Sequence, residues 1–136
     1  MDKTHTELGL TVRLHTDYDT ALQHTVDALK VEGFGVLTEI DVKETLKKKI
    51  DVDFRPYKIL GVCNPSLAHR ALTIAPEVGL LLPCNVTVAY IEDHVTDVSL
   101  VNLIAMLGFL NKVELEDIAK EAYARLERVQ TALQES

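Results

Sequence analysis

The sequence predicts an α+β domain of two layers, in which a mixed or mainly antiparallel sheet of about five strands carries helices packed on one face. Segments with period-two apolar alternation are interleaved with segments of helical period. Two strand signals also follow each other closely in the C-terminal half, which favours antiparallel neighbours. The chain has 136 residues, of which 47% are hydrophobic. This length and composition fit one domain, residues 1–136, that buries roughly two-thirds of its unfolded surface.

The chain begins with a predicted strand and a helix of about four turns. Apolar and polar residues alternate from Leu8 to His15. This pattern is typical of a strand with one solvent-exposed face, and it places His15 on that face. Thr16 then has the character of a helix N-cap, and apolar residues recur at helical spacing until Gly33 supplies a stop. His24 falls outside the apolar stripe, so we expect it in solvent.

A second strand, a short helix and a third strand follow. Residues 34–40 alternate as a strand, and Asp41 with Glu44 forms a capping-box-like start to a helix. Three lysines, residues 47–49, occupy the last turn of this helix, where cations complement the helix dipole. We therefore interpret them as a solvated helix end. After a loop, residues 57–63 predict the third strand.

The helix after the third strand has clear boundaries. Asn64 is a strong N-cap and Pro65 suits the first helical position, so the helix is predicted to run from there to Pro76. Residues 84–91 alternate as a fourth strand, and a further strand starts at Val95. These last two strands form the close pair on which the antiparallel prediction depends.

The C-terminal third contains one ambiguous segment and one clear helix. Residues 103–110 are apolar without a clean period, which fits a buried connection, an irregular helix or a subunit contact. Asn111 and Glu114 then form a capping-box pattern. One apolar stripe follows and predicts an amphipathic helix of about six turns packed on the sheet. The stripe consists of Leu115, Ile118, Ala122, Leu126, Val129 and Leu133.

Charge and hydropathy argue against several classes of function. The formal net charge is -7, so nucleic-acid backbones would be repelled and we expect no nucleic-acid partner. The longest apolar run, residues 103–110, is shorter than the roughly 20 residues that a membrane span needs. The N-terminal residues lack the apolar core of a signal peptide, so we expect no membrane partner and a cytoplasmic location. In that reducing compartment the two cysteines should be free thiols.

The two cysteines mark the candidate site, because each lies where a strand meets a turn or a helix. Cys63 and Asn64 close one strand, whereas Cys84 and Asn85 open another. If these strands are neighbours, both thiols share one edge of the sheet beside a helix N-terminus. The positive helix end would favour the thiolate of Cys63 and attract an anionic ligand. His69 lies within the first two turns of that helix. The alternative interpretation buries both cysteines as small hydrophobes.

Other site chemistries have weaker support. Two cysteines with His69 or His94 would supply three soft ligands for zinc or copper(I), but the sequence has no Cys-x-x-Cys or His-x-x-x-His spacing. No metal site is therefore predicted, and the cofactor stays open. The serines lie in no nucleophile-elbow pattern, and no Walker-type phosphate loop occurs. The lone Gly33-Phe34-Gly35 is better explained as helix stop and strand start. Whether the chain is an enzyme stays open, because no residue stands out as a general base.

Three motifs occur in order along the chain. They are residues 33–41 (GFGVLTEID), residues 57–65 (YKILGVCNP) with Ala68, and residues 82–86 (LPCNV). Together they resemble the bacterial and archaeal domain of unknown function family 302, and the resemblance covers most of the chain from Leu8 onward. The resemblance implies a two-layer α+β domain that forms a homodimer, in a family whose biochemical role is unsettled.

Three functions of different classes are compatible with the sequence. The preferred one is a small-ligand binding or sensing module with its pocket near Cys63, Asn64, Cys84 and Asn85, since paired amides suit the holding of a ligand. The second is a thiol-dependent redox or transfer enzyme that uses Cys63. The third is a structural homodimeric partner, in which a two-fold dimer hides the apolar residues 103–110.

Overall fold

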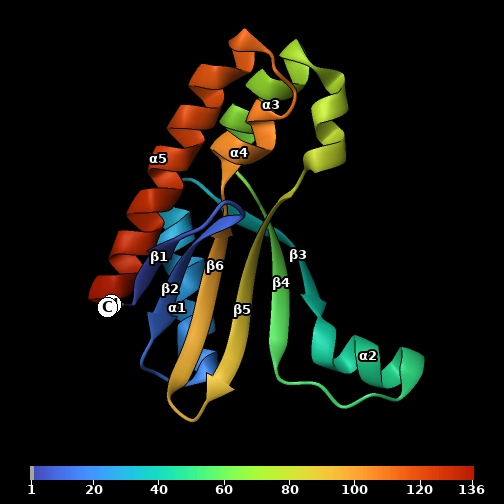
Figure 1. Cartoon of the computed structure of the whole chain (residues 1–136), viewed down its shortest axis with the longest axis vertical. Coiled ribbons are helices and arrows are strands. Elements are labelled where there is room, and N and C mark those ends of the chain that lie inside the picture. Colours follow the sequence, from blue (N-terminus) through green and yellow to red (C-terminus); the bar gives the residue numbers. More distant parts are fainter. Residues whose placement is uncertain (1) are drawn as a thin grey trace.

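The computed structural model describes residues 2–136 and contains a six-stranded sheet in the order β1-β2-β6-β5-β4-β3 (Figure 1). Neighbouring strands are antiparallel throughout. The strands are β1 (Lys3–His5), β2 (Gly9–Leu14), β3 (Gly35–Asp41), β4 (Tyr57–Cys63), β5 (Cys84–Glu92) and β6 (Val95–Val101). The predicted α+β fold class is confirmed, with one strand more than expected.

Helices connect these strands, and two of them cover one face of the sheet (Figure 1). The helices are α1 (Tyr18–Val31), α2 (Val42–Ile50), α3 (Pro65–Ile74), the 3₁₀ helix η1 (Pro76–Leu81), α4 (Leu103–Gly108) and α5 (Val113–Glu135). The caps predicted at Asp41 and Asn64 are confirmed. The Asp41 side chain accepts a hydrogen bond from Glu44 N at 3.0 Å, and the Asn64 side chain accepts one from Leu67 N at 3.3 Å. Local sequence therefore sets where α2 and α3 begin.

Two other predicted caps are wrong. The cap of α1 is Asp17 rather than Thr16, and its carboxylate accepts a hydrogen bond from Thr20 N at 2.7 Å. Thr16 is tied to the sheet instead, because its carbonyl oxygen accepts a hydrogen bond from Thr96 Oγ1 at 3.2 Å. Asn111 has a φ of 52°, a left-handed conformation that asparagine tolerates and that ends the preceding turn. It therefore lies outside α5.

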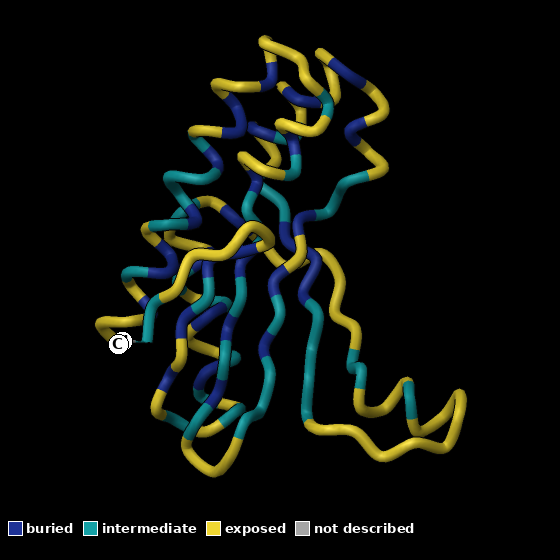
Figure 2. Tube along the Cα trace, viewed as in Figure 1, coloured by how far each residue is buried: buried dark blue, intermediate teal, exposed yellow. Residues whose placement is uncertain are grey.

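The core lies between the sheet and the helices α1 and α5, which cover the same face (Figures 1 and 2). The predicted stripe of α5 is confirmed, because its residues are all buried; they are Leu115, Ile118, Ala122, Leu126, Val129 and Leu133. The sheet contributes alternate residues of β2, β5 and β6, such as Leu10, Val12 and Leu14 in β2. His15 and His24 are exposed, as the two apolar patterns predict.

The unpredicted strand β1 has only three residues, too few to show a period. It is held by α5, which reaches it from the opposite end of the sequence. Gln130 is fully buried, and its Nε2 donates hydrogen bonds to the carbonyl oxygens of Thr4 at 3.2 Å and Thr11 at 2.8 Å. Because these contacts join residues far apart in the sequence, no local sequence pattern predicts strand β1.

The ambiguous segment 103–110 forms the short helix α4 and the turn after it. Leu103 and Leu107 are buried in the core of their own chain. Ile104 and Phe109 are exposed, Phe109 by 88%. The segment is thus a short α-helix and a turn, and one side of the helix completes the core, so only part of its apolar surface remains for a partner.

A second apolar surface lies at the far edge of the sheet. We call residues 35–56, which comprise β3, α2 and the loop to β4, the arm. No side chain of β3 or α2, residues 35–50, is buried, and Figure 2 shows most of this segment as exposed. Leu37 is 65% exposed and Ile50 is 62% exposed. The arm therefore presents apolar side chains beside an edge strand of the sheet.

Candidate functional site

The candidate site forms where β4, β5 and α3 meet. Cys63 is the last residue of β4 and Cys84 is the first residue of β5. The register places Cys84 opposite Val62, so the two cysteines lie at the same end of two adjacent strands. Immediately after Cys63, Asn64 and Pro65 start α3. The predicted site needs two adjacent strands and a helix N-terminus beside them, and both are present.

Asn64 fixes the helix start and also ties it to α1. Its Oδ1 accepts the hydrogen bond from Leu67 N, and its Nδ2 donates to the carbonyl oxygen of Glu32 at 3.4 Å. Nη1 of Arg125, on α5, donates to the same carbonyl oxygen at 3.0 Å. Both amide atoms of Asn64 are occupied within the protein. Its role in the structure is therefore to position α3, and a ligand would compete with these bonds.

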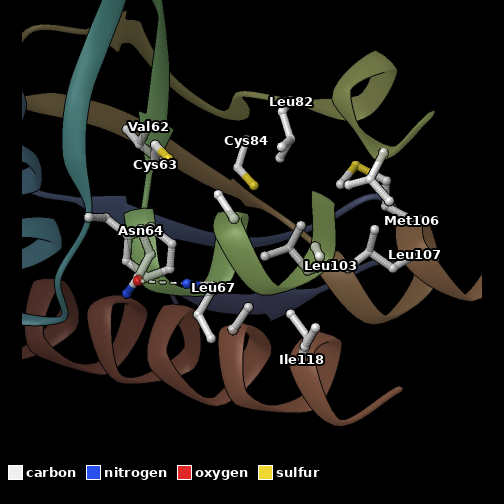
Figure 3. Close-up of a pocket in the computed structure, with 15 residues that line it drawn as sticks. Val62, Cys63, Asn64, Leu67, Leu82, Cys84, Leu103, Met106, Leu107 and Ile118 are labelled. Carbon is white, nitrogen blue, oxygen red and sulfur yellow. Dashed lines mark hydrogen bonds between the residues drawn. The ribbon is translucent and has the colours of Figure 1, made fainter. Parts of the chain in front are cut away.

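The two thiols line a small apolar cavity under α3, and Figure 3 shows both sulfur atoms directed into it. The cavity volume is ≈ 40 Å³. Its apolar wall comes from the sheet, α3, α4 and α5, and includes Val62, Leu67, Leu82, Leu103 and Ile118. The cavity holds more than the roughly 10–15 Å³ that one water needs, but is far below the 300–1,000 Å³ of ordinary ligand pockets.

The two thiols differ in their environment. Cys84 is 8% exposed, whereas Cys63 is half-buried. Burial in apolar surroundings, with a further contribution from the neighbouring Cys63, raises the pKa of the Cys84 thiol to about 11. Cys84 is thus a neutral thiol at physiological pH. Any thiolate chemistry at this site would begin with Cys63.

The raised pKa of Cys84 predicts a loss of stability at alkaline pH. An unfolded thiol ionises near pH 8.5, whereas folded Cys84 keeps its proton until about pH 11. The unfolded state therefore loses its proton first, and the free energy of unfolding should fall as pH rises through this window. Urea unfolding of the wild type and of Cys84→Ala at a series of alkaline pH values measures the effect. An equal pH dependence in both proteins would contradict it.

The structure does not bring His69 and Asn85 to the cavity. His69 is exposed on the outer side of α3, near Asp117 of α5. Asn85 is exposed on the opposite face of the sheet, beside Thr87 and Ser99, because successive side chains of a strand point to opposite faces. Of the five residues predicted for the site, Cys63, Asn64 and Cys84 line the cavity.

Met106 is the site residue that the sequence analysis missed. It lies on α4 and its side chain closes the cavity on the side away from Cys63 (Figure 3). The apolar segment 103–110 has no period from which to predict which side chains face inward. Among residues 2–136, histidine, cysteine and carboxylate side chains form no group of three that could hold a metal ion. His94 lies in the exposed turn between β5 and β6, with a φ of 59°.

Fold and site together define a small α+β domain in which an antiparallel sheet, covered on one face, carries an apolar cavity lined by two thiols. A family model described as "Domain of unknown function DUF302" matches residues 10–133. The chain therefore belongs to the DUF302 family, which confirms the resemblance seen in the sequence.

A solved structure supports the same assignment. It is described as the crystal structure of an uncharacterized conserved protein DUF302 from Bacillus stearothermophilus. That protein is 34% identical to this chain, with a TM-score of 0.83, and the alignment covers 91% of this chain and 96% of the other. No functionally curated protein matches the chain. Within residues 2–136, no helix is both long enough and apolar enough to cross a membrane.

Proposed function

We propose that this domain is a small-ligand binding module and that the thiol-lined cavity is its binding site. The observation that supports the proposal is the cavity itself, a space of ≈ 40 Å³ at the junction of six elements, which are β4, β5, α3, η1, α4 and α5. Protein interiors are packed as densely as organic crystals, and voids larger than a water molecule are few. An apolar space of this kind, with two thiols in its wall, suits a ligand of few atoms that is apolar or soft.

Xenon is a direct probe of this proposal, because dry apolar cavities bind it. We expect xenon to shift the methyl NMR signals of cavity residues such as Leu67, Leu103 and Ile118, and to leave distant methyl signals unchanged. Ala68→Val places two further methyl groups on a half-buried lining residue, and should abolish the shifts. Ala28→Val is the matched control, on a half-buried alanine of α1 that packs against the core elsewhere. A wild-type spectrum unchanged by xenon would refute an accessible binding cavity.

Thiol-dependent chemistry at Cys63 is the second candidate, favoured by the half-buried Cys63 thiol beside a second thiol. The Cys63 thiolate would attack a low-molecular-weight disulfide and release one thiolate. The Cys84 thiol, losing its proton, would then displace the other and leave a Cys63–Cys84 disulfide. The substrate is reduced and the cysteine pair oxidised. Incubation with oxidised glutathione followed by mass spectrometry should show the loss of two hydrogens, and an unchanged mass would argue against this candidate.

The arm is the surface that we propose for a homodimer. Its exposed edge strand β3 can pair with its own two-fold copy, because antiparallel pairing is compatible with an isologous interface. The arm also carries both signs of charge, with Glu39 and Asp41 on β3 and three lysines at the end of α2. A second copy could bury the apolar side chains of the arm, whereas Lys47, Lys48 and Glu39 already form ion pairs within one chain.

Sedimentation velocity tests this dimer. The wild type should sediment as a species larger than the 15.1 kDa chain. Leu37→Asp in the arm should shift it to the monomer, since a buried unpaired charge is costly. Phe109→Asp, a change at an exposed residue of the segment 103–110, should leave the dimer intact. If Phe109→Asp dissociates the dimer and Leu37→Asp does not, the interface is at α4 instead.

A further inference from the structure

We infer that Cys63 carries sulfane sulfur, the zero-valent sulfur that polysulfides transfer to thiols, and that the thiol-lined cavity holds the transferred atom. The inference depends on the proposed function, because it names the chemical class of ligand for the same cavity. It differs from the thiol–disulfide exchange described above, since Cys63 gains one sulfur atom and Cys84 stays a thiol.

The position of Cys63 is the first part of the evidence. Cys63 is half-buried, and its sulfur atom is directed into the cavity from one end, whereas Met106 closes the other end (Figure 3). An atom added to the Cys63 sulfur would therefore extend into the cavity. Because Cys63 is not fully buried, a small donor molecule in solvent can reach its thiol.

The size and the wall of the cavity suit one sulfur atom. The cavity volume is ≈ 40 Å³, which exceeds the roughly 10–15 Å³ that one water needs and is far below that of ordinary ligand pockets. A sulfur atom is only slightly larger than a water molecule. It is also soft and polarizable, and such atoms pack well against apolar side chains like Val62, Leu67 and Leu103 of the wall.

Cys84 supplies a second and independent observation. It is 8% exposed and its thiol is directed into the same cavity, where no other residue of the wall forms a hydrogen bond with it (Figure 3). An unpartnered thiol is thus buried where the transferred atom would lie. A thiol is a weak hydrogen-bond donor and a weak acceptor, so it matches a persulfide better than it matches water.

The surroundings would also protect a persulfide on Cys63. Thiolates are the nucleophiles that displace sulfur, and burial raises the pKa of the Cys84 thiol to about 11, so that Cys84 stays protonated at physiological pH. Within residues 2–136, the cavity wall contains no histidine, lysine or carboxylate side chain that could assist an attack. The carried atom should therefore be released only to a thiolate that enters from outside.

The transfer is a displacement at sulfur. The Cys63 thiolate attacks a terminal sulfur atom of an inorganic polysulfide and forms a new sulfur–sulfur bond. The bond behind that atom breaks, and its electron pair leaves with a polysulfide that is one atom shorter. The Cys63 sulfur is oxidised and the polysulfide is reduced. The resulting persulfide takes a proton from solvent, because apolar surroundings favour the neutral form. An external thiolate that attacks the outer sulfur atom accepts it and restores Cys63.

Intact-mass spectrometry after anaerobic incubation with inorganic polysulfide and desalting tests the inference. The wild type should gain the mass of one sulfur atom, and peptide mapping should place this atom on Cys63. Cys63→Ser should show no gain, whereas Cys84→Ala should show the same gain as the wild type.

A challenge with reduced glutathione tests whether the cavity shelters the carried atom. The wild type and the control Ala28→Val should lose the added sulfur severalfold more slowly than Ala68→Val, in which the cavity is filled. They should also lose it severalfold more slowly than the double variant Cys63→Ser, Ser66→Cys, in which the thiol moves to an exposed position on α3. Each variant is first checked for cooperative unfolding, and Ala68→Val provides the test if a cysteine variant does not fold.

Two results would overturn the inference. One is a wild type that loses two hydrogens and gains no sulfur, because this mass shows a Cys63–Cys84 disulfide and supports thiol–disulfide exchange instead. The other is equal loss of sulfur from the wild type, Ala68→Val and the relocated thiol. Xenon binding to the untreated protein distinguishes these failures from failure of the proposed function. If xenon binds and no sheltered persulfide forms, the cavity remains a ligand site and only the sulfur assignment is wrong.

Discussion

Replacing Leu126 with alanine is expected to lower the free energy of unfolding by about 2–5 kcal/mol. Leu126 is 1% exposed and lies in the buried stripe of α5, the helix that packs on β2, α1 and α3. The substitution removes apolar contacts and leaves a space that the surrounding helices and sheet can fill only partly. Urea unfolding followed by circular dichroism measures the change.

Leu80→Ala is the matched control for this prediction. It is the same substitution at a residue of η1 that is 85% exposed, so it should change the free energy of unfolding by no more than about 0.5 kcal/mol. A similar loss in both variants would show that the buried stripe of α5 is not the source of the effect.

Replacing Gly61 with alanine is expected to cost about 1–3 kcal/mol, although only one methyl group is added. Gly61 lies in β4, next to Thr38 of β3 and to Pro83, which leads into β5. A Cβ atom at this position would overlap Oγ1 of Thr38 and lie 2.7 Å from Cγ of Pro83. The proline ring is rigid and Thr38 is on a paired strand, so the strands themselves must shift. Thermal and urea unfolding report the loss.

Gly35→Ala controls for the general effect of alanine in a strand. Gly35 begins β3, and a Cβ atom there would meet no other atom within 4 Å. Because alanine causes no clash there, its main effect is to reduce the conformational freedom of the unfolded chain. The free energy of unfolding should therefore stay unchanged or rise by about 0.4–1 kcal/mol. Equal destabilisation by both substitutions would point to lost backbone freedom instead of the contacts of Gly61.

Local signals predicted much of the fold. The caps at Asp41 and Asn64 and the apolar stripe of α5 depend on neighbouring residues, and each is confirmed. The predicted position of the α1 cap is wrong by one residue. Thr16 and Asp17 are both good caps, and the hydrogen bond from Thr96 to Thr16 leaves Asp17 as the cap. Strand β1 depends on Gln130, a contact across almost the whole sequence, and could not be predicted from local patterns.

The placement of the two cysteines was predictable to the same degree. Cys63 and Cys84 sit at strand ends that local patterns located correctly, and antiparallel pairing of β4 with β5 brings them together. The predicted alternation of its strand already places Asn85 on the face opposite Cys84, so its distance from the cavity was also contained in the local pattern. Met106 could not be found, since it depends on how α4 folds back over the cavity.

The strand order also bears on how the chain folds as it is synthesised. From β3 to β6, neighbours in the sheet are neighbours in the sequence, so each strand can pair with the one made just before it. β2 is different, because Gly9 pairs with Val101 and Leu14 pairs with Thr96. Until β6 has left the ribosome, β2 can therefore pair only with the three-residue strand β1. During that interval Leu10, Val12 and Leu14, which are buried in the folded domain, remain exposed, and we expect this segment to be one that a chaperone binds.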